Sequence, residues 1–221
     1  MKLLSNDLEK TFSLNQHILN TLVIEDNTFF REFISKIVHF VENDSNELEI
    51  MDEDEEISPT KCEIIVDIFR ANPNNTKILT KLYSNLISGL SSDERYQDSI
   101  NFESQLYSFM DKIAFDCDYH LTYGDIDYKS IFKALNLSID TDIKGLMSNF
   151  VSYLDLSYKL LGKKIYFAVN LNTFFSQKDM GVLNDYLRYN NIVLVCLDNS
   201  LKRTLFEDEN IRIIDQDLSE I

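Results

Sequence analysis

Leu22-Val-Ile-Glu-Asp-Asn27 is the stretch that decides the fold, because an apolar run stops there on two carboxylates and a helical pattern follows. A strand that ends on polar residues and leads into a helix is typical of the carboxyl edge of an α/β sheet, where such folds keep their ligands. A nucleotide site would place glycines at this point, so that backbone N–H groups face phosphate. Glu25 and Asp26 stand there instead, which indicates a nucleotide-binding type of fold without a phosphate site.

The same order of strand and helix returns near the C-terminal end. Residues 165–169 are apolar and end on Asn170, a helical pattern follows Ser176, and residues 192–197 form another apolar run that ends on Asp198. This spacing predicts parallel strands joined by a right-handed crossover. Further strands are predicted at residues 12–18, 21–25, 48–51, 62–69 and 211–214, and a helix with one apolar face at 28–42.

The middle of the chain follows a helical period instead. Apolar residues recur every four positions from Ile78 to Leu90, and those between Ile143 and Leu161 alternate by threes and fours as in a coiled-coil seam. Gly162 then ends the pattern as a helix-terminating glycine. We therefore predict an α/β domain split into residues 1–72 and 162–221, with residues 73–161 as an inserted α-helical domain.

The composition restricts the function. The formal net charge is −16, which taken alone argues against nucleic acid, because duplex binding usually shows as a basic footprint. No long apolar run and no signal peptide are present, so the sequence predicts a cytoplasmic protein that does not enter a membrane. The three cysteines form no C-x-x-C pair and predict neither a zinc site nor a redox motif.

Four polar residues follow the predicted strands of the sheet: Glu25, Asp26, Asn170 and Asp198. Their oxygens could converge on a divalent metal, or they could cap the helices that follow, which is the interpretation we favour. Residues 22–27 are also similar to the first strand of bacterial receiver domains, with Asp67 near the place of their phosphoacceptor. The late Lys-Pro of receivers and the G-x-x-x-x-G-K-[ST] phosphate loop are both absent. A metal-dependent phosphoryl-transfer protein that uses Glu25, Asp26 and Asp67 remains the alternative function.

A second acidic set surrounds the turn at Tyr123-Gly124, and it comprises Asp116, Asp118, Asp125 and Asp127. Carboxylates at such a turn suit calcium, although the spacing of an EF-hand is absent. The alternative is ordinary helix capping by Asp125 or Asp127.

Basic residues are dispersed along the chain. Lys129 and Lys133 are four positions apart and share a helix face, whereas Lys163-Lys164 and Lys202-Arg203 are short clusters. Such residues form either a local positive lining or a solvated helix surface.

As a whole, the pattern resembles the CRISPR-associated adaptation protein of type II-A loci, in its short form. The order and spacing of several apolar runs with scattered polar anchors carry the resemblance, since none of the motifs is diagnostic alone. The matching stretches are Leu22-Val-Ile-Glu-Asp26 and its helix, residues 68–79, residues 115–137, and Lys163-Lys-Ile-Tyr-Phe-Ala-Val-Asn170 with Phe174, Lys178-Asp179 and residues 193–197.

The resemblance implies a fold and a function. The fold is an α/β head like that of an NTPase but without its phosphate loop, with a helical leg inserted in it. Members of this family form tetrameric rings, thread duplex DNA by its free ends without sequence preference, and bind calcium near the hinge of head and leg. They act beside other CRISPR adaptation proteins and the effector nuclease when new spacers are acquired in antiviral defence, and they are not known as enzymes.

The resemblance also assigns candidate sites. It implies a calcium site at Asp116, Asp118, Asp125 and Asp127, and DNA contacts at Lys61, Lys129, Lys133 and Lys144. Lys133 matches a basic position of the family, and the other lysines are chosen by their neighbourhood. His120, Thr122 and Gly124 replace acids of the family, which predicts weaker calcium coordination or other ligands. A purely structural adaptor, with no affinity for DNA, is a third alternative.

Overall fold

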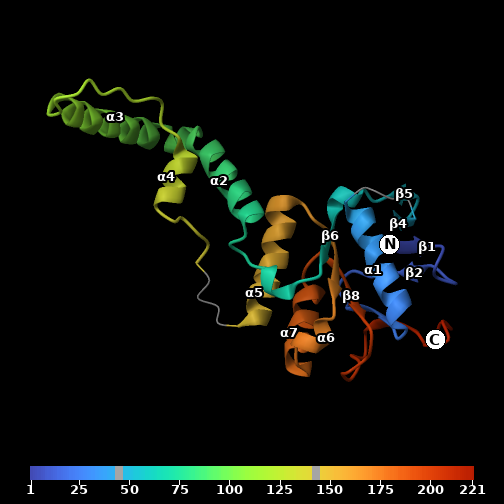
Figure 1. Ribbon diagram of the computed structural model, residues 1–221. Coiled ribbons are helices and arrows are strands. Elements are labelled where there is room, and N and C mark those ends of the chain that lie inside the picture. The colour runs from blue at the N-terminus through green and yellow to red at the C-terminus, as the bar shows by residue number, and fades with distance from the viewer. Residues whose placement is uncertain (43–46, 141–144) are drawn as a thin grey trace. The chain divides into compact units, whose positions relative to one another are not determined.

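The computed structural model describes residues 1–42, 47–140 and 145–221 (Figure 1). Contacts group the chain into two compact units. Unit 1 comprises Met1–Pro73 and Thr141–Ile221, and unit 2 comprises Asn74–Asp140.

A five-stranded parallel sheet forms the centre of unit 1. Every pair of neighbouring strands is parallel, which confirms the predicted α/β class with a mainly parallel sheet. The order across the sheet is β6 (Cys62–Ile65), β7 (Ile165–Val169), β8 (Val193–Asp198), β3 (Asn20–Ile24) and β9 (Asn210–Ile214).

Helix α1 (Asn27–Val41) covers one face of this sheet, and the predicted helix at residues 28–42 is therefore confirmed (Figure 1). The Asp26 carboxylate caps it by accepting a hydrogen bond from Phe29 N at 2.7 Å. Phe33 and Ile37 on its inner face are fully buried against the alternate residues Leu22 and Ile24 of β3. A strand that is buried on both faces has a continuous run of apolar residues. This explains why Leu22, Val23 and Ile24, which precede Glu25, are all apolar.

A second, antiparallel sheet also packs against α1, with Leu3 and Leu48 in the same core as the buried face of the helix. The order of this sheet is β2 (Phe12–Ser13), β1 (Lys2–Ser5), β4 (Leu48–Asp52) and β5 (Glu55–Glu56). The sequence missed β1, because Met1 to Ser5 carries no alternation, and it extended β2 too far. The predicted strand 62–69 was also too long, because Asp67 starts the short helix η2 (Ile68–Arg70) by accepting from Phe69 N.

The other face of the parallel sheet carries α6 (Leu171–Phe174), α7 (Gln177–Arg188) and α5 (Leu146–Leu156). Helix α7 begins with the predicted capping box, in which Ser176 N donates to Asp179 Oδ2 at 3.0 Å and Asp179 N donates to Ser176 Oγ at 3.2 Å. The π-helix η3 (Ser157–Leu161) continues α5 and ends at Gly162, which has the left-handed conformation expected of a helix-terminating glycine.

The boundary of the inserted segment differs from the prediction. Residues 145–161 were placed in the helical insertion, but they lie in unit 1. Phe150 of α5 is fully buried and its ring centroid lies 5.7 Å from that of Phe175. Helical periodicity shows that these residues form a helix, but it does not show which domain receives the apolar face.

Unit 2 contains α2 (Thr76–Leu90), α3 (Asp93–Phe115) and α4 (Tyr128–Ala134). Its two ends are joined, because the Asn74 amide accepts from Ile139 N at 2.8 Å and donates to Ile139 O at 3.0 Å. Tyr83 on α2 donates its hydroxyl to Leu137 O. Within the described residues, every helix is too short or too polar to serve as a membrane span.

Candidate nucleic-acid interface

Lys129 and Lys133 lie on α4 of unit 2, as predicted. Asp127 fixes the start of this helix by accepting from Lys129 N at 3.0 Å and from the Ser130 hydroxyl. The pKa of Asp127 is lowered, first by the hydrogen bond from Ser130 and also by the positive charge of Lys133. Lys133 is exposed and Lys129 is half-buried, and neither makes an ion pair with a described residue. Their four-residue spacing places both ammonium groups on one side of α4.

Lys61 belongs to unit 1 and ends the short helix η1 (Pro59–Lys61), which Ser58 caps. Its side chain is exposed, and its carbonyl oxygen accepts a hydrogen bond from Lys164 N at 2.7 Å. The structure therefore places Lys61 in another unit than Lys129 and Lys133. The fourth predicted lysine, Lys144, lies outside the described residues.

The four predicted calcium ligands do not form a metal site by themselves. In the described parts of the chain, no three histidine, cysteine, aspartate or glutamate side chains gather closely enough to hold a metal ion. Asp116 follows α3, its N–H bonded to Lys112 O, whereas Asp127 caps α4. Calcium takes about six to eight oxygen ligands, so these residues do not fit it within one chain.

The turn that precedes α4 is fastened to α3 by aromatic side chains. Tyr123 stacks on Tyr107 with ring centroids 5.8 Å apart, and its hydroxyl donates to the Asp111 carboxylate. This bond is the main cause that raises the pKa of Tyr123. Asp125 and Asp127 border a groove of about 270 Å³ whose other walls include Met110 and Tyr123. The acids of the turn thus line the edge of an apolar groove.

The acids at the carboxyl edge of the parallel sheet have structural partners. Asp26 accepts a backbone N–H as the cap of α1, which agrees with the interpretation that we favoured, whereas Glu25 is exposed and Asn170 makes no side-chain capping bond at the start of α6. Asp67 also accepts a backbone N–H, at the start of η2. Asp198 is 2% exposed and accepts from Asn172 N at 3.3 Å and from Asn172 Nδ2 at 2.9 Å. Burial raises the pKa of Asp198 to about 6.

Arg203 is a basic residue whose role the sequence did not reveal. Its guanidinium is buried in the loop between β8 and β9, where Nη1 donates to Glu209 Oε2 at 2.7 Å and Nε donates to Asn172 Oδ1 at 2.8 Å. Glu209 also accepts from the Thr21 hydroxyl of β3. Arg203 therefore holds three segments of unit 1 together and does not present its charge to a ligand.

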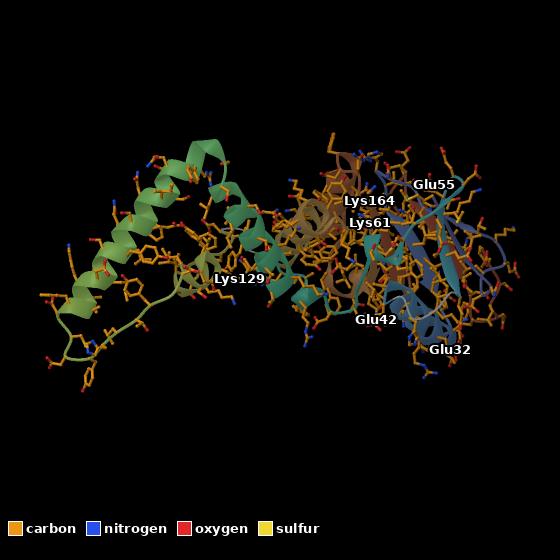
Figure 2. The ribbon with its side chains drawn as sticks, turned by 90° about the horizontal axis from the view of Figure 1, so that it is seen from above. Glu32, Glu42, Glu55, Lys61, Lys129 and Lys164 are labelled. Atoms are coloured by element: carbon orange, nitrogen blue, oxygen red, sulfur yellow. The ribbon has the colours of Figure 1, made fainter. Side chains whose placement is uncertain are left out.

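Lys163 and Lys164 are basic residues that the sequence left open as a solvated surface. Lys163 is half-buried and donates its ammonium to Cys62 O at 2.7 Å, whereas Lys164 is exposed. Figure 2 shows Lys61 and Lys164 close together, in agreement with the hydrogen bond between their backbones. The signal that could have found this group is the adjacency of β6 and β7, which the sequence alone did not specify.

Comparisons with known proteins agree with the resemblance inferred from the sequence. A CRISPR-associated protein named Csn2 from Enterococcus faecalis is 22% identical over 200 residues, which cover 86% of this chain and 88% of that protein. Among solved structures, an ATP-binding cassette of an ABC transporter in its ADP conformation matches with a TM-score of 0.41 and 10% identity, covering 87% of this chain and 74% of that one. A likeness at this TM-score carries no argument about fold or function.

A match to a protein-family model shows the family to which this chain belongs. The model described as the CRISPR-associated protein Csn2 matches residues 40–218, which is well over half of the sequence. The match includes the last two residues of α1, all of unit 2 and the strands β6 to β9. The chain therefore belongs to the CRISPR-associated Csn2 family.

Proposed function

We propose that this protein binds free ends of double-stranded DNA without sequence preference, as a homotetrameric ring that supports spacer acquisition in type II-A CRISPR adaptation. Membership of the Csn2 family supports the CRISPR-associated role. In this proposal, unit 1 is the NTPase-like head without a phosphate loop and unit 2 is the inserted leg. The observation that supports the proposed assembly is the exposed apolar surface of α3.

Helix α3 exposes an apolar stripe. No side chain described on this helix, which spans 23 residues, is buried. Phe102, Phe109 and Ile113 are 42%, 58% and 41% exposed, and at about 3.6 residues per turn they fall on one side. Tyr107 and Met110 lie on a different side, toward the Tyr123 turn.

An unburied apolar stripe on a long helix indicates a protein interface. Most helical stability in proteins comes from packing of an apolar face rather than from intrinsic propensity, so α3 needs a partner along this stripe. In a ring of identical subunits, this partner is a second copy of the chain. The tetramer would then cover apolar surface that the single chain leaves in water.

The lysines support the DNA part of the proposal. Lys129 and Lys133 on α4 and Lys61 in unit 1 make no ion pair in the described part of the chain. Lys144 is included in the proposal on the basis of the sequence alone. Four copies of such residues would line a positive hole in an acidic body, and affinity would then fall steeply with salt. A closed ring prefers free ends by topology, without reading bases.

Calcium is the cofactor in this proposal. Because the described aspartates of one chain do not gather, a calcium ion would need further oxygen ligands from a second copy or from water. The other proposed partners are the remaining CRISPR adaptation proteins and the effector nuclease. We propose no catalytic activity, and the capping bonds of Asp26 and Asp67 give no support to the phosphoryl-transfer alternative.

The proposal is tested by binding linear duplexes of unrelated sequence while the salt concentration is varied. We expect equal affinities for the different sequences and a steep salt dependence. Lys133→Gln should lower the slope of log K against log salt by about 0.9 for each phosphate contact that is lost. Lys10→Gln removes an exposed lysine from the antiparallel-sheet side of unit 1 and should leave the slope unchanged. Absence of binding at low salt would support the structural-adaptor alternative instead.

A further inference from the structure

Three lysines meet at the amino-terminal edge of the parallel sheet in unit 1. Lys61 precedes β6, and Lys163 and Lys164 precede β7. Because Cys62 of β6 pairs with Ile165 of β7 in a parallel register, both strands begin at the same edge. The hydrogen bond of 2.7 Å from Lys164 N to Lys61 O fixes the two segments side by side. We call Lys61, Lys163 and Lys164 the edge cluster.

Acids of the neighbouring segments are occupied elsewhere. Glu63 follows Lys61 by two residues, but its carboxylate accepts from the Tyr153 hydroxyl and, at 2.9 Å, from Ser157 Oγ. Asp155 pairs with Lys159 at 2.8 Å. No carboxylate among the described residues forms an ion pair with a lysine of the edge cluster, so its positive charges are not neutralised locally.

Gly162 lies beside Lys61. Its φ of +69° is a left-handed conformation that a side chain would strain, and a Cβ at this position would lie 3.6 Å from Lys61 Nζ. Lys163 donates to Cys62 O at 2.7 Å, which uses one of the three N–H donors of its ammonium. The edge cluster therefore has ammonium donors that remain available to a ligand.

The edge cluster contrasts with the paired basic residues of unit 1. Several other basic residues pair with acids, among them Arg70 with Asp67 and Arg188 with Asp208. Figure 2 shows Lys61 and Lys164 side by side and Glu32 on the far side of unit 1. Unlike these paired residues, the three lysines of the edge cluster lie side by side on adjacent segments and form no ion pair among the described residues.

We propose that the edge cluster binds phosphates of the DNA backbone and so gives unit 1 its own contact with the duplex. This inference rests on the proposed function and deepens it, because Lys163 and Lys164 join Lys61 as ligand-binding residues. Mobile ammonium groups recognise phosphate charge and do not read bases, which fits binding without sequence preference. The bound phosphates would be held by at least two lysines from adjacent segments.

The test compares two double variants of equal net charge. Lys61→Gln/Lys164→Gln removes two exposed charges of the edge cluster, and Lys2→Gln/Lys10→Gln removes two exposed charges from the antiparallel-sheet side of unit 1. Fluorescence anisotropy of a labelled linear duplex is measured over a series of salt concentrations. We expect the first variant to bind more weakly and to lose about 0.9 from the salt slope for each phosphate contact removed. The control variant should match the wild type.

Three outcomes contradict the inference and are distinguishable from one another. If the wild type binds the duplex and the Lys61/Lys164 variant keeps its slope, the edge cluster is not a contact, while the proposed function stands. If both variants lose the same affinity, net charge and not the edge cluster is responsible. If the wild type binds no linear duplex at low salt, the proposed function and this inference fail together. Equal thermal unfolding midpoints of the two variants exclude a folding defect.

Discussion

Arg203 and Glu209 form an ion pair inside unit 1, with side chains that are 4% and 0% exposed. Through this pair the loop between β8 and β9 is joined to Thr21 of β3 and to Asn172 after β7. Removing one partner of a buried pair leaves an uncompensated charge. The loop and the sheet therefore depend on both residues being present.

We predict that Arg203→Ala lowers the free energy of unfolding by about 3–5 kcal/mol, measured by urea denaturation. Arg188→Ala is the matched control, because Arg188 pairs with Asp208 at the surface, with side chains 48% and 39% exposed. An exposed pair contributes about 1 kcal/mol or less. Equal losses for the two variants would show that the burial of Arg203 has no energetic consequence.

Asp198 gives a second prediction, on the pH dependence of stability. Its folded pKa of about 6 lies above the usual value near 4, chiefly because burial penalises the charged form. The folded state holds the proton more tightly, so this contribution to stability is complete below pH 4 and is lost as the pH rises through 6. The bonds from Asn172 and the charges of Arg203 and Lys202 act in the opposite direction.

The test compares Asp198→Asn with the wild type from pH 4 to pH 7. Asparagine cannot ionise, although it offers one acceptor oxygen fewer to Asn172, and this offset is the same at every pH. We predict that the unfolding free energy of the variant, relative to that of the wild type, increases by roughly 2–3 kcal/mol as the pH rises from 4 to 7. A difference that stays constant over this range would mean that Asp198 has an ordinary pKa.

The apolar stripe on α3 gives a third prediction, on assembly. Phe109→Glu places a charge on the stripe and should lower the mass measured by light scattering, because burying an unpaired carboxylate in an interface is costly. Ser104→Glu adds the same charge to an exposed position of α3 away from the stripe. A tetramer that survives Phe109→Glu would place the subunit interface elsewhere.

Asp127 gives a fourth prediction, which separates a helix cap from a calcium ligand. Asp127→Ser retains an oxygen that can accept from Lys129 N, whereas Asp127→Ala does not. If capping is the role of Asp127, the serine variant keeps the thermal midpoint of the wild type and the alanine variant lowers it.

Calcium titration by calorimetry supplies the second readout for this pair. Loss of calcium binding in both variants, with thermal midpoints unchanged in the absence of calcium, would establish Asp127 as a ligand and contradict the capping role.

Local chemistry explains which elements could be predicted from the sequence. Residues 22–27 specified β3, the turn and the start of the next helix, because burial on both faces and polar capping residues are both visible in a short window. The sequence offered Asn27 as the cap as well as the acids, and the structure shows that Asp26 is the cap. Ser176 and Asp179 likewise identified the start of α7. The parallel arrangement followed from the spacing of strands and helices.

Features that depend on distant partners could not be predicted. The periodicity of α5 did not show that Phe150 packs in unit 1, and nothing near Arg203 indicated that Glu209 and Asn172 would surround it. The four aspartates near Tyr123 were grouped by proximity in sequence, but the turn is held by stacking on Tyr107. The edge cluster appeared only once β6 and β7 were known to be neighbours.

The most direct test of the central claim compares binding to linear and closed-circular duplexes of the same sequence, in calcium and again in chelator. A ring that is threaded by free ends should hold the linear duplex and fail to hold the closed circle, with the mass of a tetramer in the same buffer. Equal affinity for the two forms would contradict threading, because a surface that binds from the side does not distinguish a circle from a line.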